Sequence, residues 1–264
     1  MAQAVKTVLL SPSTVEAFEA YIHAAEAGIE ESRQGSEPFL WSDASSERAQ
    51  QVRQGKIAAE RWSGKESVKI QDGLIHDWIG AVFISATTVR DTLALLQDYN
   101  NHKNIYKPDV IDSRLVGRKD NDFQIYLRVL KKRIVTVVLD TDHDVHYSSI
   151  DGTRWFCRSS TTRISEVEDA GKPSEKVLPA DSGHGFLWRL ASYWRFQERD
   201  GGVYVECRAL SLSREVPKGL GWIVEPIVGQ VPKQSLINTL TATRQALAAG
   251  AAQVSFPPPN PSSS

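Results

Sequence analysis

The stretch GFLWRLASYWRFQER, residues 185–199, sets the main constraint on how the rest of the chain folds. Its large apolar side chains fall on every second residue, and this alternation predicts a strand in a sheet whose two faces have different surroundings. The apolar face carries Phe186, Trp188, Leu190, Ser192, Trp194 and Phe196, and the other face carries Arg189, Tyr193, Arg195 and Gln197. Two tryptophans and two phenylalanines on one face need a large apolar partner, which is a helix, an apolar ligand or both.

The composition narrows the class of protein. The chain has 264 residues, of which 41% are hydrophobic and 24% charged, as in an ordinary globular protein of one large domain or one domain with an extension. Lys and Arg number 31 against 32 Asp and Glu, for a net charge of −1. This balance argues against a nucleic-acid partner and a polybasic membrane contact. No apolar run approaches the ~20 residues of a membrane span, so only transient membrane contact stays open.

The N-terminal sequence leaves two compartments open. Residues 1–13, MAQAVKTVLLSPS, lack the charged and apolar regions of a signal peptide. With Met1 as the native start, we expect a cytoplasmic protein. The MAQA sequence also fits what remains after cleavage at an A-x-A site, and in that case we expect export to the periplasm or out of the cell.

The N-terminal segment is predicted to be an extension that packs on a main domain. Ser13–Glu16 matches a capping box, and apolar residues then recur at helical spacing as far as Arg33. The aromatic residues of this segment, such as Trp41, need burial that the segment cannot supply alone. We predict a helical extension over 1–65, a main domain over 66–250 and a disordered tail over 251–264. The sequence does not decide whether the extension caps a cavity, braces the back of the sheet or binds a partner.

The main domain is predicted to be an antiparallel meander followed by a long helix. The predicted order is a strand over 74–85, a helix from Thr88, strands over 111–118, 122–131, 134–147, 152–165, 185–199 and 203–213, and a C-terminal helix with Pro232 in its first turn and Gly250 at its end. Short turns between most strands force antiparallel hairpins, and no βαβ alternation is present. The fold class is therefore α+β. Gly80, inside the first strand, predicts a bend or the close approach of another backbone.

Residues 166–185 interrupt the regular series of strands. The segment contains two prolines, three glycines and many charges, which is typical of a lid, a binding loop or a disordered insert. Successive antiparallel connections alternate between the two ends of a sheet. The turn 131–133, this loop and the junction 214–219 are therefore expected at one end, where we predict the gate of a cavity.

Three segments carry a resemblance to a known superfamily. They are GLIHDWIGAVFISATTVRDTLALLQDYNNHKNIYKPDV from Gly73, HGFLWRLASYWRFQERDGGVYVECRALSLSR from His184 and PKGLGWIVEPIVGQVPKQSLINTLTATRQAL from Pro217. Over residues 70–249 the chain resembles START-like members of the SRPBCC superfamily, relatives of polyketide cyclases and START lipid-transfer proteins, and in particular a bacterial group within it. The resemblance implies a helix-grip fold, in which a curved antiparallel sheet of about seven strands wraps a long C-terminal helix around an apolar cavity.

The strand faces predict which residues line such a cavity. Side chains at every second position of 122–131 and of 134–147 share a face, as they do in the tryptophan strand. The predicted lining residues are Trp188, Trp194, Phe196, Leu190, Phe123, Ile125, Leu127, Val137, Leu139, Trp155, Trp222, Leu236 and Leu240. The competing interpretation is that the aromatic residues form solid core against the leucines of the C-terminal helix.

The sequence shows no catalytic or metal-binding motif. The tract Asp140–His146 is rich in possible ligands, but it lacks the turn glycine and distal glutamate of a calcium loop, and His143 points away from the aspartates. No GxSxG elbow, phosphate loop or dinucleotide fingerprint occurs. Cys157 and Cys207 lie in different predicted strands and are expected to be buried free thiols. We therefore expect no catalytic residue, no metal and no cofactor.

The leading hypothesis is non-catalytic binding or transport of a hydrophobic small molecule, such as a lipid, an isoprenoid or a polyketide-like compound. One alternative is a cyclase- or hydrolase-type enzyme that uses the same cavity and needs two or more ionisable groups inside it. Another is a protein-interaction module whose cavity is filled by its own side chains. Because one fold serves many functions, the resemblance does not choose among the three.

Overall fold

The computed structural model describes residues 7–33, 38–62, 64, 66–132, 136–215 and 221–255. The helices are α1 (Pro12–Arg33), α2 (Ser46–Arg53), α3 (Val89–Gln97), α4 (His102–Ile105) and α5 (Gly221–Ser255), with 3-10 turns η1 (Trp41–Ala44) and η2 (Tyr99–Asn101). The strands are β1 (Val8–Leu9), β2 (Ala58–Arg61), β3 (Val68–Ile70), β4 (Gly73–Ser85), β5 (Val110–Lys119), β6 (Asp122–Lys132), β7 (Thr136–Ser149), β8 (Arg154–Glu168), β9 (Lys176–Val177), β10 (Ser182–Gly183), β11 (Arg189–Arg199) and β12 (Gly202–Arg214).

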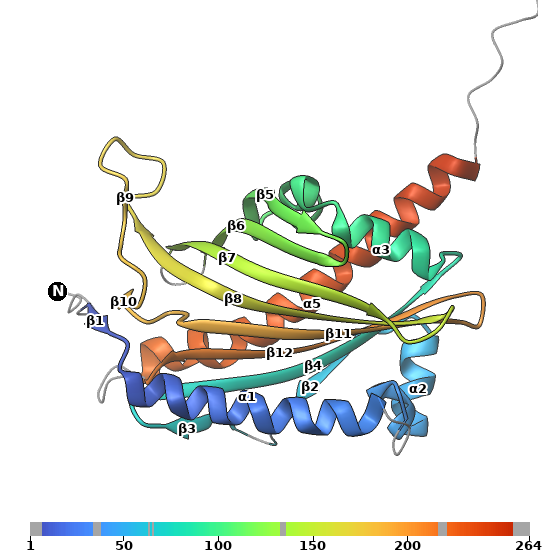
Figure 1. Cartoon of the computed structure of the whole chain (residues 1–264), viewed down its shortest axis with the longest axis horizontal. Helices are drawn as coiled ribbons and strands as arrows, with labels where there is room; N and C mark the ends of the chain where they lie inside the picture. The colour runs from blue at the N-terminus through green and yellow to red at the C-terminus, as the bar shows by residue number, and fades with distance from the viewer. Residues whose placement is uncertain are drawn as a thin grey trace, which may run out of the picture.

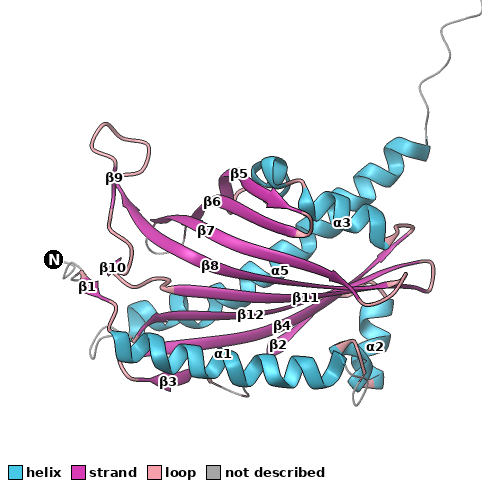
Figure 2. Cartoon of the chain, in the orientation of Figure 1, coloured by secondary structure: helices cyan, strands magenta, loops and turns pink. Residues whose placement is uncertain are grey.

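One antiparallel sheet dominates the molecule. Its strands follow the order β2-β4-β12-β11-β8-β7-β6-β5, with β3 also paired to β4 and β9 to β8, while β1 and β10 form a separate small sheet. The long strands are β4, β5, β6, β7, β8, β11 and β12, and together they form a curved sheet crossed by α5 (Figures 1 and 2). The α+β class and the helix-grip architecture predicted from the sequence are confirmed.

The two faces of the sheet have different coverings. On one face, α5 and α3 pack over a cluster that includes Trp78, Phe196 and Leu240. On the other face, α1 packs through Phe18 and Ile22 onto a second cluster. Figure 1 shows α5 behind the strands and α1 in front of them, so the sheet separates the two helices. This arrangement puts α1 on the back of the sheet, away from α5.

Gly80 lets α5 approach the sheet closely. A Cβ atom built on Gly80 would lie 2.9 Å from Leu240 Cδ1, 3.1 Å from Leu236 Cδ2 and 3.2 Å from the carbonyl oxygen of Ala58. The two leucines belong to α5, and Ala58 belongs to the edge strand β2. A side chain at residue 80 would therefore compete with the helix for the same space.

The ends of two helices differ from the predictions. The first helix begins at Pro12, and the backbone N–H of Thr14 donates to Ser11 Oγ (3.3 Å), so Ser11 rather than Ser13 precedes the first turn. The last helix begins at Gly221, so Pro232 lies inside it, and it continues beyond Gly250 to Ser255. A proline removes one hydrogen bond from a helix but does not fix where the helix begins when tertiary packing holds it on a sheet.

Within the described ranges, no helix has the length and apolar character that crossing a bilayer requires. Residues 256–264, which belong to the tail predicted to be disordered, lie outside the described part of the chain.

Candidate ligand-binding cavity

A cavity of about 590 Å³ lies between the sheet and α5. Every long strand contributes to its wall, and α3, α4 and α5 close the other side. Most of the lining side chains are apolar, including Val145 of β7, Ala209 of β12 and Ala242 of α5. A volume of this size lies within the ~300–1,000 Å³ typical of small-molecule sites.

The structure places eight of the predicted lining residues at this wall. They are Leu190, Trp194, Phe196, Ile125, Leu127, Val137, Leu139 and Leu236. Trp194 illustrates how the register brings them together: it pairs with Cys157 of β8 on one side and Cys207 of β12 on the other, and both cysteines line the same cavity. The thiols are free and buried, as expected.

Trp188 lies on the opposite face of the sheet. It is 4% exposed and belongs to the cluster that α1 covers, together with Phe18 and Leu212. The prediction extended the alternation of the strand to this residue, but β11 begins only at Arg189. Before that point the chain turns at Gly185, whose φ is +76°, so the period of two does not apply.

Three further predicted residues form solid core instead of cavity wall. Phe123 packs edge-on against the rings of Tyr99 and Tyr147, at centroid distances of 5.4 and 5.6 Å. Trp155 packs against the same cluster, and Leu240 is fully buried against it. None of these three side chains is part of the wall of the cavity between the sheet and α5. The side chain of Trp222 lies outside the described part of the structure.

The cavity also holds polar side chains that the prediction did not include. His76, His102 and His143 line it from β4, α4 and β7, and each is less than 9% exposed. Burial lowers the pKa of each of the three imidazoles to about 4, so all are neutral at neutral pH. The only cue in the sequence was the position of His143 on the strand face opposite the aspartates.

The aspartates of the same tract have structural partners. Asp140 accepts hydrogen bonds from Tyr126 and from Nε and Nη2 of Arg128, and Asp142 accepts one from Arg163. Within the described ranges, no three His, Cys, Asp or Glu side chains converge as a metal site would need. Asp140 and Asp142 therefore brace the outer face of the sheet, whereas Thr141, His143 and Val145 of the same tract line the cavity.

The thiols and tyrosines of the cavity are not activated for chemistry. Burial raises the pKa of Cys157 and of Cys207 above the ordinary thiol value, which keeps both protonated. Burial also raises the pKa of Tyr106 to about 12 and that of Tyr99 further. A protonated buried thiol is a poor nucleophile, so these groups contribute to the lining of the cavity and are not activated for reaction.

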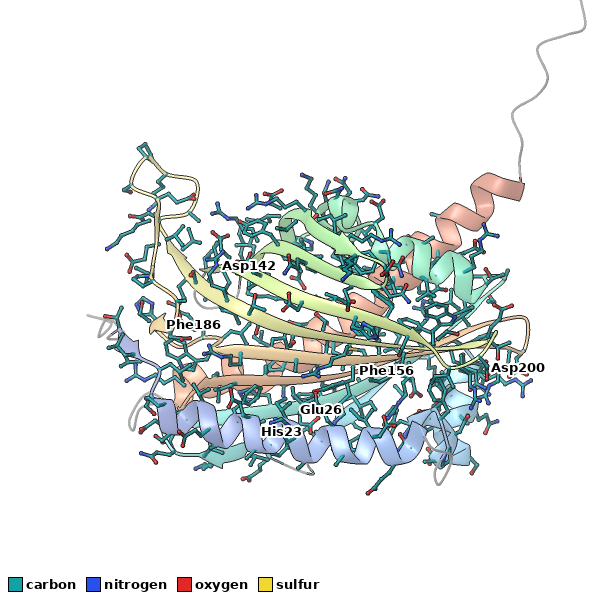
Figure 3. The ribbon with its side chains drawn as sticks, in the orientation of Figure 1. His23, Glu26, Asp142, Phe156, Phe186 and Asp200 are labelled. Carbon is teal, nitrogen blue, oxygen red and sulfur yellow. The ribbon has the colours of Figure 1, made fainter. Side chains whose placement is uncertain are left out.

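The charged residues of the lining gather at one end. They are Lys107, Asp109 and Lys131, and Lys131 Nζ lies 2.6 Å from Asp109 Oδ2. Phe186 and Leu187, which precede β11, line the cavity too, and Figure 3 shows Phe186 at the end of the sheet from which β9 projects, opposite Asp200. Residue 133 of the predicted turn and residues 216–219 of the predicted junction lie outside the described part of the chain.

The loop that follows β8 is fastened to the sheet by Glu166. This buried carboxylate accepts hydrogen bonds from the backbone N–H groups of His184 (2.9 Å) and Gly185 (2.9 Å), and from that of Phe186 (3.4 Å). The imidazole Nδ1 of His184 lies 2.8 Å from the same carboxylate. Earlier in the loop, β9 pairs with the end of β8. Glu166 thus fixes the part of the loop that leads into the cavity wall.

We expect Glu166→Gln to loosen this part of the loop and to lower the free energy of unfolding by about 1.5–3 kcal/mol, because a buried carboxylate loses hydrogen bonds that an amide cannot fully replace. Hydrogen exchange of peptides covering 183–187 should become at least about tenfold faster. Glu168→Gln is the matched control, since Glu168 is an exposed residue at the end of the same strand. Equal protection in both variants would show that Glu166 does not hold the loop.

The curved antiparallel sheet with α5 packed on one face forms a helix-grip fold. No protein-family model matches the chain, and the search of curated proteins gives no match either. Among solved structures, the chain is similar to a STAR-related lipid transfer protein (fragment 25–204) from Xanthomonas axonopodis, with 18% identity over 70% of this chain and 98% of that one and a TM-score of 0.45. It is similar to human STARD10, with 9% identity over 73% and 76% of the two chains and a TM-score of 0.44. It is also similar to the Zhui aromatase/cyclase from Streptomyces sp. R1128, with 10% identity over 69% and 96% and a TM-score of 0.41. The fold class follows from the strand order and the position of α5 described above.

Proposed function

We propose that this protein binds a hydrophobic small molecule in the cavity between the sheet and α5, as a carrier or receptor and not as an enzyme. The observation that carries the proposal is the apolar cavity of about 590 Å³ between the sheet and α5. Well-packed interiors rarely hold voids much larger than a water molecule, so an apolar space of this size favours an occupant. Ligand binding would gain ~25 cal/mol for each Å² of apolar surface buried, less the cost of ordering the ligand.

The alternative of an enzyme has less support from the described residues. An acid–base mechanism needs groups poised near the working pH. The three cavity histidines instead have pKa values near 4, and the charged lining residues sit together at one end. A binding function requires neither a histidine with a pKa near neutral pH nor charged groups spread along the cavity.

Binding of the uncharged fluorescent probe N-phenyl-1-naphthylamine tests the proposal. We expect the wild-type protein to bind it, and Ala242→Phe to weaken binding by at least about tenfold, equal to ~1.4 kcal/mol, because the new ring occupies the cavity. Ala248→Phe is the matched control, because Ala248 is exposed on the same helix. Circular dichroism would verify that both variants fold. Absence of probe binding to the wild type, or equal loss in both variants, would refute the proposal.

A further inference from the structure

His143 is the polar side chain whose chemistry inside the cavity the structure defines best. It lies on β7, is 7% exposed and forms part of the cavity wall. Its Nε2 atom lies 2.9 Å from Thr141 Oγ1, and the Thr141 hydroxyl in turn lies 3.1 Å from the carbonyl oxygen of Leu127. These contacts link the imidazole to the backbone of the neighbouring strand β6.

The chain of hydrogen bonds fixes the tautomer of the ring. A hydroxyl has one hydrogen, and that of Thr141 is donated to the carbonyl of Leu127, which can only accept. The Thr141 oxygen must therefore accept in its contact with His143, so Nε2 carries the hydrogen. In a neutral imidazole the other nitrogen, Nδ1, is then a bare acceptor. The lowered pKa of His143, about 4, keeps the ring neutral at pH 7.

Nδ1 of His143 receives no hydrogen bond from the described residues. The other histidines of the wall are placed differently. His76 has a serine hydroxyl on each ring nitrogen, Ser67 at 2.8 Å and Ser213 at 2.9 Å. His102 donates through Nε2 to the carbonyl of Leu96, and its Nδ1 likewise receives no hydrogen bond from the described residues. Its ring, however, lies against the rings of Tyr99 and Tyr106 at centroid distances of 4.8 and 4.9 Å.

The surroundings of His143 favour an uncharged partner. The fixed charges of the lining, Lys107, Asp109 and Lys131, gather at one end, and Lys131 is paired with Asp109. A carboxylate or phosphate beside His143 would lose its hydration without gaining a cation there, which is costly. An alcohol or phenol, by contrast, carries a hydrogen that a bare imidazole nitrogen accepts.

We infer that the cavity selects an uncharged apolar ligand bearing a hydroxyl group, and that Nδ1 of His143 accepts the hydrogen of this hydroxyl. The inference rests on the proposed function, because it names the class of ligand for the same cavity. Thr141 acts as a positioning residue that holds the ring in the accepting tautomer.

Three matched probes test the inference: 4-octylphenol, its methyl ether 4-octylanisole, which lacks the donor hydrogen, and 4-octylbenzoate, which is anionic at pH 7. Each competes with N-phenyl-1-naphthylamine. We expect the wild type to bind the phenol about 3- to 10-fold more tightly than the ether, the range for one neutral hydrogen bond. His143→Leu should bring this ratio to about 1 without weakening the ether, and His143→Asn should restore part of it through its amide oxygen. His146→Leu is the control that should leave the ratio unchanged, because His146 lies on the same strand, is 55% exposed and is not part of the cavity wall.

A second readout is the protonation state of the His143 ring, which nuclear magnetic resonance reports in the wild type and in Thr141→Val. The ¹⁵N chemical shifts of His143 in the wild type should show a protonated Nε2 and a bare Nδ1, and Thr141→Val should shift the tautomer balance and reduce the phenol-to-ether ratio. If the wild type bound phenol and ether equally and Ala242→Phe weakened binding of both, the inference would be overturned and the proposed carrier function would be retained. Tightest binding of the benzoate would overturn it in favour of an acid ligand. No binding of any probe would refute the proposed function itself.

Discussion

Lowering the pH from 7 to 5 is expected to reduce the free energy of unfolding by about 5 kcal/mol, because the unfolded chain takes up protons on three histidines that the folded protein keeps neutral. Burial lowers the pKa of His76, His102 and His143 to about 4. An unfolded histidine protonates below pH ~6.5, so between pH 6.5 and 4 the unfolded state binds more protons. Stability is therefore present above pH 6.5 and is lost as the pH falls towards 4.

Chemical denaturation at pH 7, 6 and 5 measures this effect, and single variants isolate it. His143→Leu should remove about a third of the pH dependence, since each histidine contributes up to ~1.4 kcal/mol per pH unit. Ala248→Phe should leave it unchanged, because Ala248 is exposed and the substitution changes no titratable group. The comparison of variants is needed because burial raises the pKa of Glu206. This shift stabilises the folded state as the pH falls, which is opposite to the effect of the three histidines. Constant stability between pH 7 and 5 would contradict the expectation.

The alternation of 185–199 was sufficient to predict the sheet and its two faces. Within β11, the residues Leu190, Trp194 and Phe196 lie on the cavity side, and Tyr193 lies on the side of α1. The alternation does not extend to Trp188, which lies one residue before the strand begins. A periodic pattern describes side-chain direction only where the backbone is regular, and the sequence does not mark that limit.

The position of the cavity along the sheet could not be predicted from strand faces. Phe123 and Ile125 point to the same face, but Phe123 meets the aromatic rings near α3 whereas Ile125 meets open volume. That difference depends on where α3 and α5 sit along the strands, which is a property of the tertiary packing. The proposed role of His143 could not be predicted from the sequence either. It depends on the contact of His143 with Thr141 and on the hydrogen bond from Thr141 to the carbonyl of Leu127 in the neighbouring strand.

A buried ion pair on the back of the sheet gives the second large expected effect. Asp77 is fully buried in β4, and its carboxylate accepts two hydrogen bonds from Arg208 of β12, from Nε at 3.0 Å and from Nη2 at 2.6 Å. The hydroxyl of Tyr21 in α1 donates to the same carboxylate at 2.9 Å. The pair therefore joins two central strands to the N-terminal helix, and Arg208 is itself only 7% exposed.

We expect Asp77→Ala to lower the free energy of unfolding by about 3–5 kcal/mol, because it leaves the Arg208 guanidinium buried without its counter-charge. Urea denaturation measures the loss. The double variant Asp77→Leu with Arg208→Met should lose less than Asp77→Ala alone, since it removes both charges and restores apolar contact. Asp122→Ala is the comparison, because it breaks an exposed pair in which the side chains of Asp122 and His146 are 65% and 55% exposed. It should lower the free energy of unfolding by less than ~1 kcal/mol. A larger loss of free energy of unfolding in the double variant than in Asp77→Ala would mean that the ion pair itself supplies net stability. The burial of an unpaired charge would then not explain the result. Tyr21→Phe separates the contribution of α1, because it removes one hydrogen bond and leaves the ion pair in place.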